Sequence, residues 1–284
     1  MSIEKVGVIG GGLMGSGITE VSARAGLDTV VVEVTEEAAK AAEGRVRASL
    51  ERAASRGKIT EADLDETLGR IEFTTDLAAL ADRDLVVEAA SENEDVKLEL
   101  FKKVGSILTK DTAILTSNTS SIPIVKLGAV SGRATNVMGV HFFNPAPVMQ
   151  LVELIPSLTT SPETMASMQS FVTDTLGKQP IEATDRAGFV VNSLLVPYLL
   201  SAIRMYEAGY ASAADIDRGM VLGCGHPMGP LALSDLIGLD TIRAIGISMY
   251  EEFKEPLYSP PPLLDRMVDA GLLGKKSGHG FYAY

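Results

Sequence analysis

The chain of 284 residues contains very little cysteine and histidine, and no tryptophan. Its one cysteine, Cys224, cannot form an intramolecular disulfide, which is typical of a reducing compartment, so we expect a cytoplasmic protein. We predict Cys224 to be a small buried residue rather than a nucleophile. His226 and His279 lie in segments rich in glycine or proline, without a second ligand at metal spacing. We therefore expect no metal site.

Basic residues and long apolar runs are also scarce. Lys and Arg number 25 against 37 Asp and Glu, which argues against a nucleic-acid binder because such proteins need a basic surface. The most apolar predicted helix, 189–203, is shorter than the ~20 residues of a membrane span and contains Asn192 and Pro197. The apolar run from Val6 leaves no room for a signal peptide ahead of it. We expect a soluble protein that binds neither nucleic acid nor membrane.

Short apolar runs alternate with amphipathic segments through the first two thirds of the chain. This alternation predicts βαβ units and a mostly parallel sheet that is buried on both faces. Strands are predicted at 6–9, 29–33, 70–74, 84–89, 113–117, 136–143, 150–155 and 179–183, with helices at 13–25, 36–56, from Thr60, 94–108 and from Ser161 to Gly177. After Asp185 only helices are predicted, at 188–207, 212–222, 230–253 and 262–270. We expect an α/β domain at 1–185 and an all-helical domain at 186–284.

A glycine-rich turn follows the first predicted strand. Its sequence matches GxGxxG, with Gly10, Gly12 and Gly15 in the glycine positions and Leu13 and Met14 between them. Between a strand and a helix, this motif predicts a Rossmann-type dinucleotide site, where the backbone approaches a pyrophosphate at the helix N-terminus. Glu33 ends the second strand, eighteen residues after Gly15, and a carboxylate there favours NAD over NADP. The alternative is a structural turn followed by a surface glutamate.

A histidine and a glutamate occupy symmetric positions about Pro147. If the two strands that flank it form an antiparallel hairpin, His141 and Glu153 face each other. A buried Glu beside a His fixes its tautomer and stabilises the imidazolium, as a general base requires. A core histidine paired for structural reasons is an equally good interpretation of the spacing.

Three further polar features have both a functional and a structural interpretation. The run Ser117–Ser121 follows a strand at the edge where open parallel sheets bind ligands, or is an ordinary loop with a helix cap. Asn192 interrupts an apolar helix and must be satisfied by a ligand or by another helix. A basic helix face could hold the phosphates of coenzyme A, or be solvated surface; it consists of Arg45, Ser49, Arg52 and Arg56.

Together these features resemble the short-chain L-3-hydroxyacyl-CoA dehydrogenase family, in particular the bacterial 3-hydroxybutyryl-CoA dehydrogenases. The resemblance runs from Val6 to Tyr284. It rests on the order and spacing of Gly10–Gly15, Glu88-Ala89 with Glu92 and Lys97, Ser117–Ser121, His141–Pro145 with Pro147, Gly188–Asn192, His226–Pro230, Gly238–Thr241, Gly274–Lys276 and Gly280–Tyr282. Gly11 stands where relatives often have Ala, a departure that we expect to be harmless.

The resemblance implies a role for each of these groups. His141 is the general base, oriented by Glu153, while Ser120 and Asn192 bond the reacting oxygen. The cofactor is NAD, and Glu92, Lys97 and Asn118 contact it or shape its nicotinamide end. The acyl-CoA substrate is bound by Ser49, Arg52, Arg56, Ser120, Asn144 and Asn192. The helical domain forms a homodimer and contributes to substrate binding.

The implied reaction is NAD-dependent oxidation of a short-chain (S)-3-hydroxyacyl-CoA to the 3-oxoacyl-CoA and its reverse, which serves fatty acid metabolism among other pathways. Two alternatives remain open. One is a dehydrogenase of a free hydroxy acid or sugar acid such as L-gulonate, which would not need the basic helix face. The other is a relative that binds NADH without catalysis.

Overall fold

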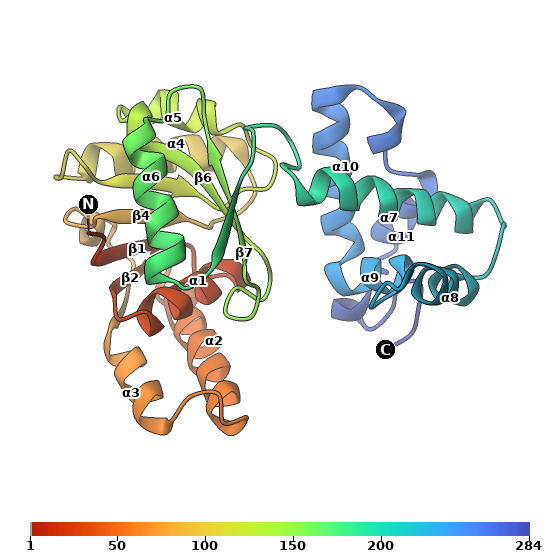
Figure 1. Cartoon of the computed structure of the whole chain (residues 1–284), viewed down its shortest axis with the longest axis horizontal. Helices are drawn as coiled ribbons and strands as arrows, with labels where there is room; N and C mark the ends of the chain where they lie inside the picture. Colours follow the sequence, from red (N-terminus) through yellow and green to blue (C-terminus); the bar gives the residue numbers. More distant parts are fainter. Residues whose placement is uncertain (1) are drawn as a thin grey trace. The chain divides into compact units, whose positions relative to one another are not determined.

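The computed structural model describes residues 2–284, and the chain divides into two compact units, Met1–Asp185 and Arg186–Tyr284. The first unit is built on an eight-stranded sheet in the order β3-β2-β1-β4-β5-β6-β7-β8 (Figure 1). The strands are β1 (Lys5–Ile9), β2 (Asp28–Val32), β3 (Ile71–Thr74), β4 (Leu85–Glu88), β5 (Ile114–Ser117), β6 (Val137–Phe142), β7 (Leu151–Pro156) and β8 (Gln179–Glu182).

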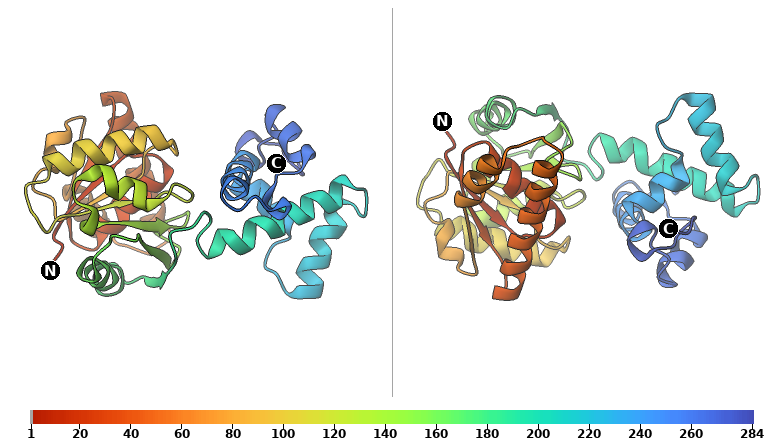
Figure 2. Two further views of the ribbon diagram at one scale, coloured as in Figure 1. Left: turned by 90° about the horizontal axis from the view of Figure 1, so that it is seen from above. Right: turned by 90° about the horizontal axis from the view of Figure 1, so that it is seen from below.

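Helices connect the strands of the first unit and make up most of the second, where Figure 2 shows them in teal to blue. The first unit contains α1 (Leu13–Arg24), α2 (Glu36–Ser55), α3 (Glu61–Gly69), α4 (Glu94–Ile107), α5 (Ile124–Ser131) and α6 (Pro162–Ser170), which a π-helical turn at Phe171–Thr175 extends. The second contains α7 (Val191–Glu207), α8 (Ala213–Cys224), α9 (Pro230–Ile237), α10 (Leu239–Phe253) and α11 (Pro262–Asp269). Short 3₁₀ helices lie at Leu77–Leu80, Ala134–Asn136, Pro256–Tyr258 and Lys275–Ser277.

The sheet is parallel from β3 to β6, and β7 pairs antiparallel with β6 before β8 pairs parallel with β7. The predicted fold, a mostly parallel Rossmann-type sheet followed by a helical region, is confirmed. The strand order reverses between β1 and β4, and such a switch point leaves a crevice beyond the carboxyl ends of the strands. A ligand site is therefore expected at this edge of the sheet.

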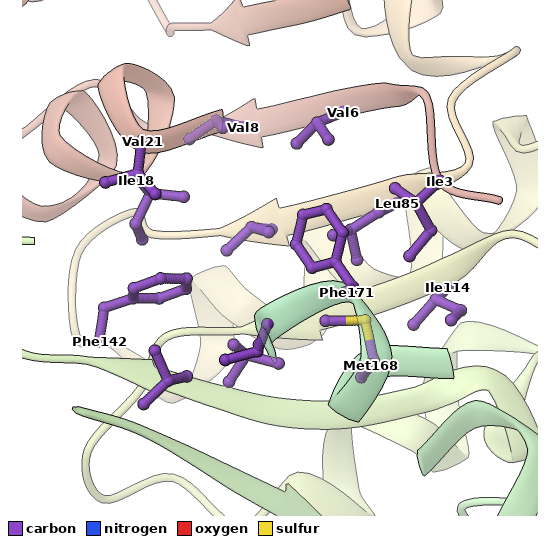
Figure 3. Packing of buried hydrophobic residues seen from close by; sticks show 14 of the residues in the cluster. Ile3, Val6, Val8, Ile18, Val21, Leu85, Ile114, Phe142, Met168 and Phe171 are labelled. Carbon is purple, nitrogen blue, oxygen red and sulfur yellow. The ribbon is translucent and has the colours of Figure 1, made fainter. Parts of the chain in front are cut away.

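Strands covered on both faces explain why the sequence shows continuous apolar runs. All four residues of β4 and of β5 are buried, as a parallel sheet between two helical layers requires. Figure 3 shows Val8 of β1 near Ile18 of α1, with Val6 and Phe142, at the end of β6, in the same core. This core fixes the strand ends from which the site is built.

Local capping explains most of the helix starts that the sequence predicts. The Thr60 hydroxyl accepts a hydrogen bond from the Asp63 N–H while the Asp63 carboxylate accepts one from Thr60, so the two residues form a capping box at the start of α3. Ser161, where a helix start is predicted, caps α6, and Pro162 lies in its first turn.

Two local predictions were wrong, and one helix was not predicted. The helix expected at 230–253 is two helices, because Gly238 has a φ of 104° and breaks the helical path between α9 and α10. Helix α5 was not predicted; no side chain nearby in sequence caps it, and the carboxylate of Asp185 accepts the Ile124 and Val125 N–H groups instead. Cys224 is exposed rather than buried, because it lies eight residues after buried Ile216, about 80° around α8 from it.

The second unit has its own core, to which its C-terminal tail is attached by a buried carboxylate. Asp235, which is fully buried, accepts hydrogen bonds from the Phe281 and Tyr282 N–H groups and from the Tyr284 hydroxyl. Burial is the main reason that the pKa of Tyr284 is raised to about 12. None of the helices within residues 2–284 combines the length and apolar character that crossing a membrane requires.

Helices α4 and α5 meet at a glycine, which gives a test of the packing behind the site. A Cβ built at Gly105 would lie 1.9 Å from the Ser131 carbonyl oxygen, so Gly105→Ala should lower the free energy of unfolding by about 1–3 kcal/mol through overpacking. Gly44→Ala in α2 is the matched control, because its Cβ would meet nothing within 4 Å and should stabilise by about 0.5–1 kcal/mol. Urea unfolding followed by circular dichroism measures both. Equal stability of the two variants would contradict the assigned contact.

Candidate active site

The glycine-rich turn lies in the crevice between β1 and β4. Gly10 has a φ of 89°, and a Cβ there would lie 2.9 Å from the Ala89 carbonyl oxygen. A Cβ on Gly15 would lie 1.7 Å from the Gly10 carbonyl oxygen, so helix α1 packs too closely on the turn for any side chain. Gly12 faces open space, and no side chain caps the N-terminus of α1. The turn therefore fits a phosphate group held by backbone N–H donors.

Glu33 is held against this turn from the end of β2. One of its carboxylate oxygens accepts the Gly11 N–H at 2.6 Å and the other accepts the Val34 N–H at 3.2 Å. Packing also requires glycine at position 11, since a Cβ there would lie 2.3 Å from the Ala42 Cβ. The carboxylate thus lies beside the turn, where it suits a nucleotide that carries ribose hydroxyls.

His141 and Glu153 are paired as the spacing predicts. They are register partners across β6 and β7, and the His141 Nδ1 lies 2.7 Å from a Glu153 carboxylate oxygen. His141 is 7% exposed and Glu153 is fully buried, so the pair is screened little by water. The Phe143 ring meets the imidazole edge to face, with centroids 4.7 Å apart. A histidine held in this way can exchange a proton while the carboxylate stabilises its charged form.

The turn after His141 is held by a lysine that sequence reasoning missed. Lys178 is 5% exposed, and its ammonium group donates to the carbonyl oxygens of Ala146 and Met149 at 2.8 and 2.7 Å. Burial, and to a smaller extent the charge of Arg24, lowers the pKa of Lys178. No motif marks this residue in the sequence, because its partners are backbone atoms about thirty residues away.

The loop after β5 is brought against the end of β6. The Asn118 side-chain oxygen accepts the Phe142 N–H at 2.8 Å, which ties this loop to the residue after His141. Glu92 accepts the Ser120 N–H at 3.0 Å and the Ser121 hydroxyl at 3.0 Å. The structure thus gathers Glu92, Asn118 and Ser120 at the same sheet edge as His141.

Lys97, by contrast, is buried beneath this loop. It is 1% exposed, and its ammonium group is bonded to both carboxylate oxygens of Glu88, at 2.6 and 2.8 Å. Glu92 is its second carboxylate partner, at 3.4 Å. Lys97 therefore supports the two glutamates and does not itself face the crevice. In the sequence, Glu88 appeared only as part of the family motif Glu88-Ala89, without a role.

A groove of about 480 Å³ runs between α1, α2 and the turn at 144–147. The predicted substrate residues Ser49, Arg52 and Asn144 line it, together with Arg45 and Leu13. Arg56 does not line it and forms the C-cap of α2. The basic helix face therefore faces a groove over most of its length.

The two remaining sequence predictions concern Asn192 and metal binding. Asn192 belongs to the second unit, where it is half-buried at the second position of α7. Within residues 2–284, no three His, Cys, Asp or Glu side chains are grouped as a metal ion would require.

Comparison with known proteins finds similarity over nearly the whole chain. Residues 5–186 match the family model for the NAD binding domain of 3-hydroxyacyl-CoA dehydrogenase, and residues 188–284 match that for its C-terminal domain. A 3-hydroxybutyryl-CoA dehydrogenase of Mycobacterium tuberculosis is 56% identical over 283 residues, which cover 100% of this chain and 99% of the relative.

Solved structures agree with the sequence comparison. The crystal structure of M. tuberculosis FadB2 has a TM-score of 0.99 at 56% identity and covers 100% of both chains. That of the (S)-3-hydroxybutyryl-CoA dehydrogenase PaaH1 from Ralstonia eutropha has a TM-score of 0.94 at 46% identity, over 100% of this chain and 99% of that one. The chain therefore belongs to the 3-hydroxyacyl-CoA dehydrogenase family of NAD-dependent oxidoreductases.

Proposed function

We propose that this chain oxidises short-chain (S)-3-hydroxyacyl-CoA thioesters to 3-oxoacyl-CoA with NAD, and catalyses the reverse reduction. The observation that carries the proposal is the buried His141–Glu153 pair at the carboxyl edge of a dinucleotide-binding sheet. Relatives that are similar over the whole chain are named for 3-hydroxybutyryl-CoA, which we take as the substrate.

The hydrogen bond between His141 and Glu153 determines which ring nitrogen exchanges a proton with the substrate. With Nδ1 bonded to Glu153, the proton exchanged with the substrate is carried on Nε2. In oxidation, His141 takes the proton of the 3-hydroxyl group as hydride leaves C3, and Glu153 stabilises the imidazolium. In reduction, the imidazolium returns the proton to the oxygen on C3. The hydride acceptor and donor is the nicotinamide of the bound cofactor.

Hydrogen-bond donors around the reacting oxygen complete the proposed chemistry. The Ser120 hydroxyl, on the loop that Glu92 holds, donates to this oxygen, and we propose the Asn192 amide as the second donor from the family resemblance. Donors aimed at developing charge lower the barrier by stabilising the oxygen in the transition state.

Residues that follow four strands, β1, β2, β4 and β5, bind the different parts of the cofactor. The turn Gly10–Gly15, with Leu13 and Met14 at the start of α1, takes the pyrophosphate, and Glu33 takes the adenosine ribose. Glu92 and Asn118 lie on the nicotinamide side, where Lys97 acts through Glu92.

The groove beside α2 is the proposed binding site of the coenzyme A portion. Arg45, Ser49 and Arg52 supply charge and hydrogen bonds along one wall, while Asn144 lies on the other. A free hydroxy acid would not need this wall, so the groove favours the thioester over the free acid.

We also propose a cytoplasmic homodimer formed through the second unit. Its surface carries several large exposed apolar side chains, with Leu194 at 75%, Leu222 at 78% and Tyr210 at 81% exposure. Apolar surface of this kind is typical of protein contacts.

The first test is NADH oxidation at 340 nm with acetoacetyl-CoA. We expect rapid loss of NADH with the thioester, and little with free acetoacetate. NADPH should be much poorer, because Glu33 repels a 2′-phosphate. Equal rates with free acetoacetate would move the assignment to a hydroxy acid dehydrogenase.

His141→Ala tests the base. It should lower kcat by about 10²–10⁴-fold, the usual contribution of a positioned acid–base group, while NADH binding measured by fluorescence stays unchanged. His279→Ala, which removes an exposed histidine of the tail, is the control and should keep the wild-type kcat. A His141→Ala enzyme with near-normal turnover would rule out the mechanism.

Arg52→Ala tests the groove. Loss of one charged hydrogen bond should raise KM for acetoacetyl-CoA about tenfold or more. KM for acetoacetyl-N-acetylcysteamine, which lacks the nucleotide portion, should not change. Arg56→Ala, just outside the groove, should have the smaller effect. An equal rise with both thioesters would mean that Arg52 does not contact the coenzyme A portion.

A further inference from the structure

A fully buried carboxylate anchors a network beneath the proposed oxygen donor. Glu88, at the end of β4, accepts hydrogen bonds from the Ala90 N–H at 2.7 Å and from the Ser117 hydroxyl at 2.6 Å, in addition to the two from Lys97. It is 0% exposed and Lys97 is 1% exposed. A carboxylate that is buried and bonded in this way cannot reach a ligand, so its effect on the reaction must pass through its partners.

Lys97 connects this carboxylate to the loop. Its ammonium group, held by Glu88, also lies 3.4 Å from a carboxylate oxygen of Glu92, and the Glu92 side chain is 41% exposed. The other Glu92 oxygen accepts the Thr119 hydroxyl, the Ser120 N–H and the Ser121 hydroxyl. A continuous path, made of hydrogen bonds and the Lys97–Glu92 ion pair, therefore runs from β4 to the backbone of Ser120.

The same carboxylate reaches the loop by a second, shorter path. The Ser117 hydroxyl, which donates to Glu88, accepts the Thr119 N–H at 3.2 Å. The Thr119 hydroxyl oxygen in turn accepts the N–H groups of Ser121 and Ile122. Both ends of the short loop are thus fixed with respect to Glu88.

Stability alone is a weak reason for such a pair. Desolvation of two charges offsets much of their attraction, and well-packed apolar residues of similar volume are often as stable. The pair does supply an orientation, because a buried cation between two carboxylates holds the exposed one in place.

We propose that Glu88 is a positioning residue for the dehydrogenase reaction: through Lys97 and Glu92 it holds the Ser120 hydroxyl where the reacting oxygen is bound. This inference rests on the proposed function. It assigns a role in the reaction to a residue that touches neither substrate nor cofactor.

Glu88→Gln keeps the shape and removes the charge. We expect kcat for acetoacetyl-CoA reduction to fall about 10- to 100-fold, the scale of a small misplacement of a reacting group, with KM for both substrates changed less than threefold. Glu99→Gln is the matched control, because it breaks the exposed Glu99–Lys103 pair on α4, the helix that carries Lys97, and should leave kcat unchanged.

A double-mutant cycle separates positioning from general destabilisation. Ser120→Ala should itself lower kcat, and adding Glu88→Gln should lower it little further, because the hydroxyl group to be positioned is gone. Effects that multiply independently would overturn the proposal.

A second variant covers the case in which Glu88→Gln fails to fold. Glu88→Gln/Lys97→Met removes the unpaired buried ammonium group, so it should fold while kcat stays low. Recovery of wild-type kcat in this double variant would mean that the pair serves folding alone.

The wild-type rate distinguishes this inference from the proposed function. A wild-type chain that does not reduce acetoacetyl-CoA overturns both. A wild-type chain that turns over normally, alongside a Glu88→Gln variant with the same kcat, overturns the positioning role alone.

Discussion

The parallel pairing of six neighbouring strands, β3 to β6 in sheet order, is the constraint on which the first unit depends. Because these strands run in one direction, their carboxyl ends meet at a single edge. The glycine turn follows β1, Glu33 follows β2, Glu88 ends β4 and Ser117 ends β5. Groups separated by more than a hundred residues in sequence thus become neighbours without any local preference for one another.

The antiparallel strand β7 supplies the partner of His141. An antiparallel partner places Glu153 directly opposite His141 and buries it, since β8 covers the other side of β7. A carboxylate in this position contacts the imidazole Nδ1 while shielded from solvent. The proposed proton-transfer group His141 and its partner Glu153 therefore belong to the scaffold of the sheet, while the proposed oxygen donor Ser120 belongs to a loop.

Loops need support that strands do not, and buried charges supply it here. Lys178 holds the turn at 146–149 by two carbonyl oxygens, and Lys97 holds Glu92 against the Ser120 loop. Both ammonium groups are almost completely buried, where hydrogen bonds to charge are stronger than in water. The proposed reaction thus depends on rigid loops at the sheet edge, and each is attached to the scaffold by one buried lysine.

The sequence by itself determined all the strands, most of the helices and the ligand class. Its apolar periodicity predicted the sheet, and the glycine motif with Glu33 predicted a dinucleotide site, because both depend on local spacing. The symmetry about Pro147 predicted that His141 and Glu153 would face each other, since hairpin register follows from the length of the turn. Only the tertiary structure decided that Asp185 caps α5, that Arg56 falls outside the groove, and that Lys97 is buried against Glu88. These contacts join residues far apart in the chain or depend on which face of a helix is covered, and neither leaves a local pattern in the sequence.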